Sequence, residues 1–208
     1  MKVILISGPD GVGKSTICTK LMDYYSEQKL SVLVKWLRFN HMLAKLVNVL
    51  GRLTGKSYYE HHSWGKVGYH NYHGAIGYLY IIAVYLDHII FRLFSRKKIF
   101  ENTDNDVLIV DRYIIDIMAD LIVDTGKNDL VVRVFQKYAL RDLGTSKAFI
   151  LVCDPEIVMT RRDDIIDDKS YNKKIEAYKF LSESFGIETI DTGVNQPNQV
   201  IDIISKAS

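Results

Sequence analysis

Eight consecutive residues, 8 to 15, combine the groups that bind phosphate. They read Gly-Pro-Asp-Gly-Val-Gly-Lys-Ser and directly follow the apolar residues 3–6. Glycines let a backbone approach a ligand closely and turn its N–H groups inward, while the lysine supplies a mobile positive charge and the serine a hydroxyl for Mg²⁺. The helix predicted from residue 14 to 27 would direct its positive dipole end at the same place. The predicted ATP-binding residues of this loop are Gly8, Asp10, Gly11, Val12, Gly13, Lys14, Ser15 and Thr16.

A second chemical signature ends the apolar run 107–111 and reads Asp111-Arg112-Tyr113. In an open parallel sheet, the carboxyl end of a strand is where ligands bind. Asp111 is therefore predicted to hold Mg²⁺, directly or through water, together with Ser15. Arg112 can contact a phosphate through two nitrogens, which a lysine cannot do. An ion pair at the end of a strand is the simpler alternative, but the phosphate loop earlier in the chain favours the functional interpretation.

Apolar runs alternate with helical patterns along the chain, which predicts an α/β fold of three layers, with helices on both faces of a five-stranded parallel sheet. The expected strands are residues 2–7, 31–36, 107–111, 148–153 and 186–190. A long, mainly helical block is expected from 40 to 100, followed by helices near 114–124, 130–142, 172–184 and 197–205, with Pro155 starting another. We expect residues 1–208 to form a single domain.

Composition excludes several classes of partner. The chain has 208 residues, 27 of them basic and 25 acidic, for a formal net charge of +2. This balance gives no reason to expect binding to nucleic acid or to a membrane surface. Cys18 and Cys153 lie far apart in expected core elements, and the N-terminus shows no cleavable signal pattern, so a cytoplasmic protein is expected. The apolar stretch 75–94 contains Asp87, His88 and Arg92, which favours a buried core helix over a membrane span.

Two further stretches leave alternatives open. Residues 57–80 are rich in tyrosine and histidine; they could form a polar, aromatic wall over an acceptor pocket, a surface or dimer contact, or a metal site from His61, His70 and His73. Residues 161–169 form a charge run. It is either a solvated loop or a lid, extending over 161–171, in which Arg161 and Arg162 stabilise transferred charge.

Taken together, these motifs resemble the thymidylate kinase family. The matching pieces are residues 8–16, Asp111-Arg112-Tyr113, the stretch 151–162, Tyr178, and Ile190-Asp191 before a last helix. The resemblance implies a P-loop kinase fold, a homodimer, the use of ATP and Mg²⁺, and transfer of the ATP γ-phosphate to a nucleoside monophosphate. It assigns acceptor binding to Asp10, Arg38, Arg112 and Tyr113, catalysis to Lys14, Arg112 and Arg161, and contacts with ATP to Arg161 and Arg162. The acceptor would bind in a helical region of about 38–100.

The sequence departs from the family pattern where the acceptor base would bind. The Arg-Glu-Pro segment after the second strand is represented only by Arg38, and residues 83–88 lack the arginine that touches the base in the family. We therefore predict that dTMP is a poor acceptor. A kinase of another small molecule and a nucleotide-binding regulatory protein without transferase activity remain as alternatives. A GTPase switch is disfavoured because no Asn-Lys-x-Asp segment occurs.

Overall fold

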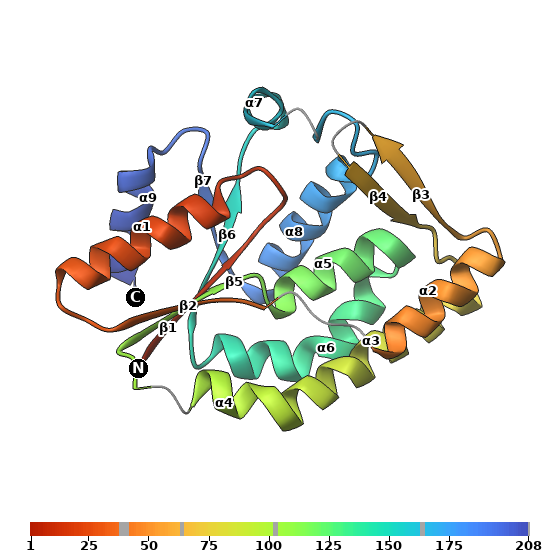
Figure 1. Cartoon of the computed structure of the whole chain (residues 1–208), viewed down its shortest axis with the longest axis horizontal. Coiled ribbons are helices and arrows are strands. Elements are labelled where there is room, and N and C mark those ends of the chain that lie inside the picture. The colour runs from red at the N-terminus through yellow and green to blue at the C-terminus, as the bar shows by residue number, and fades with distance from the viewer. Residues whose placement is uncertain (38–41, 63–64, 102–103, 163–164, 208) are drawn as a thin grey trace.

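A computed structural model describes residues 1–37, 42–62, 65–101, 104–162 and 165–207. Its central sheet has five parallel strands in the order β2-β5-β1-β6-β7 (Figure 1). The strands are β1 Lys2–Ser7, β2 Val32–Trp36, β5 Val107–Asp111, β6 Lys147–Val152 and β7 Glu188–Asp191. The predicted five-stranded parallel sheet is confirmed, with strand ends shifted by at most two residues.

Helices cover both faces of the sheet because its strands are apolar on both sides. Along β1, Ile4 and Ile6 pack into one core with α1 Lys14–Glu27 and α9 Pro197–Ala207. Leu5 points to the opposite face and packs into the second core, under α3 Ala75–Phe91, α5 Ile114–Thr125, α6 Asn128–Leu143 and α8 Tyr171–Phe185. Figure 1 shows α1 beside α9, and α5, α6 and α8 on the other side. The predicted three-layer α/β fold is thus confirmed.

The register of the central strands positions the site. Ile6 of β1 pairs with Asp111 of β5, so that the two strands end side by side. The phosphate loop leaves β1 at this edge and Arg112 leaves β5 there. The backbone N–H of Arg112 donates to the carbonyl of Ile6 over 3.0 Å. A direct hydrogen bond therefore joins the end of β1, just before the phosphate loop, to the residue that follows β5, although the two are far apart in the sequence.

The block from 40 to 100, expected to be mainly helical, contains a β-hairpin that was not predicted. Between α2 Leu43–Leu53 and α3, strand β3 Ser57–His62 pairs in antiparallel fashion with β4 Gly65–His70. Tyrosines favour a pleated surface, and they outweigh the helical preference of their surroundings here. After α3 the chain continues through a π-helical turn, Arg92–Arg96, into α4 Lys97–Phe100. The remaining helix, α7 Pro155–Arg161, begins at Pro155 as expected.

The apolar stretch expected as a buried core helix is only half buried. One face of α3, including Ile76, Ile81 and Val84, packs into the core. On its other face Leu79 and Ile82 are 46% and 54% exposed. By length and composition, the helical run Ala75–Phe100 could span a membrane, and 39% of its apolar window is buried inside the protein. Burial of the first face agrees with the expected core helix, and the second face is exposed in the single chain.

Candidate active site

The phosphate loop takes a path that only glycine permits at two points. Gly8 has φ of 143°, and a Cβ there would lie 2.3 Å from the carbonyl oxygen of Leu151. Gly11 has φ of 83°, and a Cβ there would meet the side chains of Val158 and Ile165. These are conformations and contacts that a side chain would block. The loop thus packs closely against β6 on one side and against α7 and Ile165 on the other.

Lys14 curls back over its own loop. The ammonium donates to the carbonyl oxygen of Gly8 over 2.7 Å and to that of Pro9 over 2.5 Å, and the residue is only 5% exposed. Burial and the nearby Arg112 lower the pKa of Lys14 to about 8, in spite of the neighbouring carboxylates. Burial removes water from the Lys14 ammonium and so destabilises its positive charge. A phosphate bound at the loop would stabilise that charge, so this lysine favours an anion there.

Ser15 and Asp111 provide a pair of oxygen ligands suited to Mg²⁺. The Ser15 hydroxyl donates to Asp111 Oδ2 over 3.2 Å, while Asp111 Oδ1 is buried and has no hydrogen-bond partner among the described residues. Burial raises the pKa of this carboxyl above its ordinary value. In the part of the chain that the structure describes, no three His, Cys, Asp or Glu side chains gather into a metal site. The pair therefore fits an ion that keeps waters and takes its other ligands from phosphates, as Mg²⁺ does.

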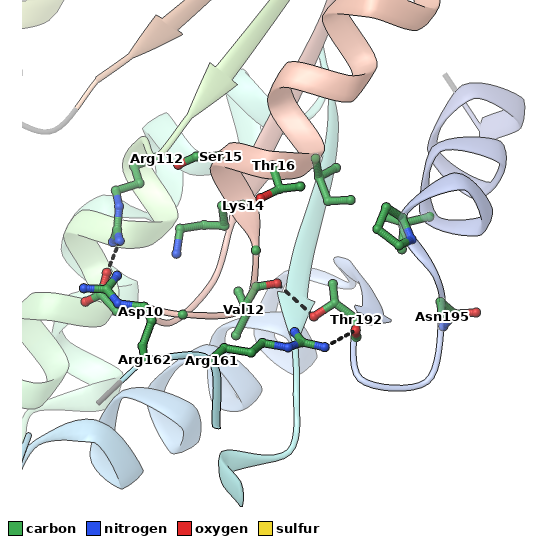
Figure 2. A pocket seen from close by; sticks show the side chains of 15 residues that line it. Asp10, Val12, Lys14, Ser15, Thr16, Arg112, Arg161, Arg162, Thr192 and Asn195 are labelled. Carbon is green, nitrogen blue, oxygen red and sulfur yellow. Dashed lines mark hydrogen bonds and ion pairs between the residues drawn. The ribbon is translucent and has the colours of Figure 1, made fainter. Parts of the chain in front are cut away.

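A cavity of about 450 Å³ opens in front of the loop. Its floor is the loop and the start of α1, and Arg161 and Arg162 line it from the end of α7 (Figure 2). Arg161 Nη2 donates to the carbonyl oxygen of Thr192 over 3.1 Å. The Thr192 hydroxyl in turn donates to the carbonyl oxygen of Val12 over 2.8 Å. Thr192, Asn195 and Pro197 complete the wall after β7 and were not predicted. The only signal for them was their position after a strand of a parallel sheet.

Arg112 follows β5 with φ of 65°, a left-handed conformation that is rare for any residue but glycine. Its guanidinium pairs with Asp10 of the phosphate loop and lies 3.9 Å from Asp116. Burial would lower the pKa of Arg112, but Asp10 and Asp116 outweigh it and raise that pKa. Backbone strain that the surroundings maintain at a charged residue is typical of functional positions.

Asp116 on α5 is a buried centre of this arrangement that sequence reasoning missed. It is 4% exposed and accepts hydrogen bonds from the Ser7 hydroxyl (2.8 Å), the Tyr113 backbone N–H (3.0 Å) and the Tyr178 hydroxyl (2.7 Å). A signal was present, since Asp116 is a charged residue inside the apolar run 114–119. Buried carboxylates in such runs have polar partners, which predicts a network.

Tyr113, which was predicted to bind the acceptor, has its side chain in the core. The residue is 2% exposed, and its ring centroid lies 5.3 Å from that of Phe100 in the core. Tyr113 forms the N-cap of α5 and is not among the residues that line the cavity in front of the phosphate loop. Two other predictions, the acceptor contact of Arg38 and the part of the charge run at Asp163 and Asp164, lie outside the described residues.

The tyrosine- and histidine-rich stretch forms much of a second cavity, of about 490 Å³. The hairpin, the end of α5 and the start of α8 enclose it, and none of its lining residues lines the first cavity. The three-histidine metal site is not formed by the described residues; the ring of His70 instead hydrogen-bonds the Ser57 hydroxyl at 2.9 Å and stacks on Tyr72. The stretch therefore combines a cavity wall with a packed aromatic cluster.

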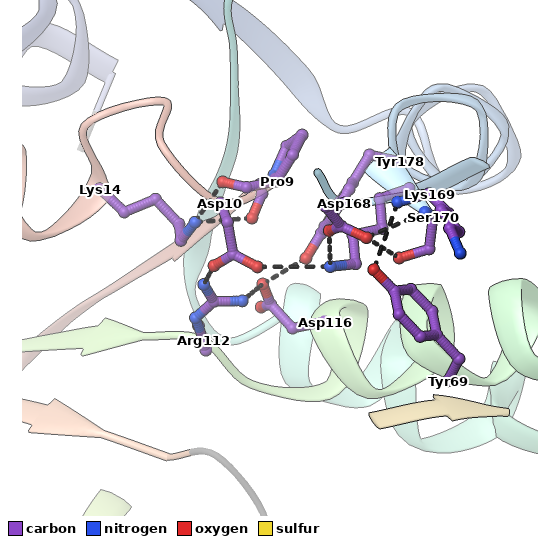
Figure 3. A network of polar contacts seen from close by, with 12 residues as sticks. Pro9, Asp10, Lys14, Tyr69, Arg112, Asp116, Asp168, Lys169, Ser170 and Tyr178 are labelled. Carbon is purple, nitrogen blue, oxygen red and sulfur yellow. Dashed lines mark hydrogen bonds and ion pairs between the residues drawn. The ribbon is translucent and has the colours of Figure 1, made fainter. Parts of the chain in front are cut away.

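The hairpin also contacts the segment predicted to be a lid. The Tyr69 hydroxyl donates to the carbonyl oxygen of Asp167 over 3.2 Å and accepts from the backbone N–H of Lys169 over 3.4 Å (Figure 3). The Lys169 ammonium also pairs with Glu60 of β3 at 2.5 Å. The end of the predicted lid is therefore attached to the acceptor-side region.

Comparison with known proteins supports the fold. No protein-family model and no curated protein sequence matches the chain. Among solved structures, the thymidylate kinase from Candida albicans is similar, with a TM-score of 0.57 and 17% sequence identity over 99% of this chain and 90% of that chain. The chain thus has a thymidylate kinase-like P-loop kinase fold.

Proposed function

We propose that the protein is a kinase that transfers the γ-phosphate of MgATP to a (deoxy)nucleoside monophosphate. The observation that carries the proposal is the convergence on one edge of the sheet of Lys14, the Ser15–Asp111 pair and Arg112, with Arg161 across the cavity. These are the positive charges and oxygen ligands that phosphoryl transfer requires. The fold shared with a thymidylate kinase is consistent with them.

In this proposal the protein positions the reactants and stabilises charge. Loop N–H groups and Lys14 bind the phosphates of ATP, and Ser15 and Asp111 hold Mg²⁺, which neutralises charge on the phosphate oxygens when bound. An oxygen of the acceptor phosphate attacks the γ-phosphorus while the bond to the bridging oxygen of ADP breaks. Arg112 and Arg161 face the transferred group from opposite sides of the loop, where positive charge stabilises the transition state more than the ground state.

The segment 161–171 acts as the lid, and residues of about 38–100 form the acceptor side of one kinase domain. Exclusion of water is needed because a wet site would hydrolyse ATP. Asp10 and Arg38 contact the acceptor, the former at its sugar. Both cysteines in the described chain are free and buried, which supports a cytoplasmic location.

The test is an ADP-release assay with MgATP and a panel of nucleoside monophosphates. We expect at least one acceptor to accelerate ADP release over the rate without acceptor, and dTMP to be used poorly. Efficient turnover of dTMP, with kcat/KM of about 10⁴ M⁻¹s⁻¹ or more, would show that the missing base-contacting arginine does not govern specificity. The similar Candida enzyme is described as broad in substrate specificity, which is a reason to test ribo- and deoxynucleotides of every base.

A regulatory protein that binds ATP without transferring phosphate is the second candidate. The pairing of Arg112 with both Asp10 and Asp116 favours it, because the arginine is occupied by carboxylates. If the protein binds ATP but no acceptor in the panel accelerates ADP release, the regulatory function is supported and the kinase function is refuted.

We also propose that two copies of the chain associate through α2 and α3. Both helices expose apolar side chains. In α2, Leu46 and Leu53 are 68% and 81% exposed, and Phe94, three residues after α3, is 79% exposed. An apolar surface of this kind is rare on monomers and typical of interaction sites. Sedimentation analysis should give a dimer for the wild type and a monomer for Leu53→Glu. A monomeric wild type would refute the proposal.

A further inference from the structure

Lys174 of α8 places a positive charge between two carboxylates from different parts of the chain. Its ammonium lies 2.8 Å from Asp168 Oδ2, just before α8, and 3.6 Å from Asp10 Oδ2, in the phosphate loop. The side chain is 21% exposed. Burial by itself would lower the pKa of Lys174, but Asp10 and Asp168 outweigh it and raise that pKa, so the charge is retained.

Asp168 holds the lysine in place and fixes the start of α8 at the same time. Its Oδ1 accepts from the backbone N–H of Ser170 over 2.9 Å and from the Ser170 hydroxyl over 2.6 Å (Figure 3). The other oxygen, Oδ2, accepts from Lys174. The lysine is thus attached to the end of the predicted lid through a carboxylate whose two oxygens both accept hydrogen bonds.

Asp10 divides its two oxygens between two cations. Oδ1 pairs with Arg112 and Oδ2 faces Lys174. Burial alone would raise the pKa of Asp10, yet Arg112, Lys174 and Lys14 hold it well below its usual range. With one cation on each oxygen, the carboxylate has a single orientation. Without Lys174, it would be free to turn both oxygens toward Arg112, as a carboxylate and a guanidinium prefer.

We propose that Lys174 is a positioning residue: it holds Asp10 so that Arg112 remains available to the acceptor phosphate, and it couples that geometry to the closed end of the lid. The inference rests on the proposed function. Lys174 acts through Asp10 and Arg112 in this reading, and its loss should slow the transfer step more than it weakens ATP binding.

The first experiment measures the titration of Asp10 and needs no activity. Aspartate labelled with ¹³C at the carboxyl group gives a resonance that is assigned by its loss in Asp10→Asn. In Lys174→Ala its midpoint should move to higher pH by about one unit or more, because an opposite charge within a few ångströms is removed. Lys174→Arg and Lys179→Ala, the latter an exposed lysine on the same helix, should leave it unchanged. An unmoved midpoint in Lys174→Ala would overturn the proposal.

The second experiment compares the same variants in steady-state kinetics with an acceptor found in the panel. Lys174→Ala should lower kcat about tenfold or more, with the KM for ATP changed less than about threefold. Lys174→Arg should recover most of the rate, and Lys179→Ala should match the wild type. If Lys174→Ala keeps more than half of the wild-type kcat, the positioning role is wrong. A wild type that releases no ADP with any acceptor refutes the proposed function instead, and the titration of Asp10 then decides alone about Lys174.

Discussion

The charge of Lys14 makes nucleotide binding depend on pH in a range where few other groups titrate. Burial and Arg112 lower the pKa of Lys14 to about 8 in the free protein. The phosphates of a bound nucleotide would raise it again, since opposite charge favours the ammonium form. Binding is then linked to proton uptake, so that affinity is full well below pH 8 and falls as the pH rises through 8.

The size of the effect follows from the fraction of protonated Lys14. With a pKa of about 8, that fraction falls from about 0.9 at pH 7 to about 0.1 at pH 9. If only the ammonium form binds phosphate, Kd increases about tenfold over this range, which is about 1.4 kcal/mol. At pH 8 about half a proton should be taken up for each nucleotide bound.

Calorimetry with ADP, in the absence of divalent metal, measures both quantities. Titrations at several pH values give Kd, and titrations in two buffers of different ionisation enthalpy give the proton uptake. Lys14→Arg is the matched control because its guanidinium stays charged up to pH 9, so that only the ionisation of ADP itself can change its Kd. A wild-type Kd that changes less than about twofold, or a variant that follows the same pH curve, would refute the reasoning.

Three more predictions test single side chains. Arg112→Lys should lose nearly as much kcat as Arg112→Ala, because a fork-like contact needs the planar guanidinium; recovery of most of the rate by lysine would make Arg112 a simple counter-ion. His88 is fully buried, and its pKa is lowered by burial and by Arg92 from 6.5 to about 4, so the folded state prefers the neutral ring. The stability due to this preference is full above pH 6.5 and is lost as the pH falls toward 4. Urea titrations should therefore show the unfolding free energy fall by about 3 kcal/mol over this range, and His88→Gln should remove this pH dependence. Asp142→Ala should lower the unfolding free energy by about 3–5 kcal/mol, because it leaves Arg92 and Arg96 without the carboxylate that pairs with both, at 2.6 and 2.9 Å; a loss below about 1 kcal/mol in the same assay would contradict this.

Local patterns account for the parts of the fold and site that could be predicted from the sequence. The phosphate loop depends on glycine conformations and on a strand directly before it. Both can be recognised in one continuous stretch of the sequence. The strands buried on both faces are continuous apolar runs, so their number and order of appearance could be predicted. The hairpin could not be predicted, because the apolar and aromatic residues within 57–70 are irregularly spaced and lack the period of two that marks a half-buried strand.

The rest of the site arises from tertiary contacts that no local pattern records. Lys174 and Asp10 are separated by most of the chain and meet only because α8 returns to the phosphate loop. Tyr113 shows the opposite case. It belongs to a chemical motif, but the backbone turn into α5 directs its side chain into the core, whereas Arg112 just before it faces the cleft.

The contact between Tyr69 and residues 167–169 attaches the two ends of the segment 161–171 to different parts of the molecule. Two hydrogen bonds and one exposed ion pair attach residues 167–169 to the hairpin. By the usual size of such contacts, these three contribute about 1–4 kcal/mol together. Arg161, at the other end of the segment 161–171, donates to the carbonyl oxygen of Thr192 beside the first cavity. If the proposed function holds, nucleotide can leave the first cavity when the Arg161–Thr192 contact breaks, without loss of the contacts between residues 167–169 and the hairpin.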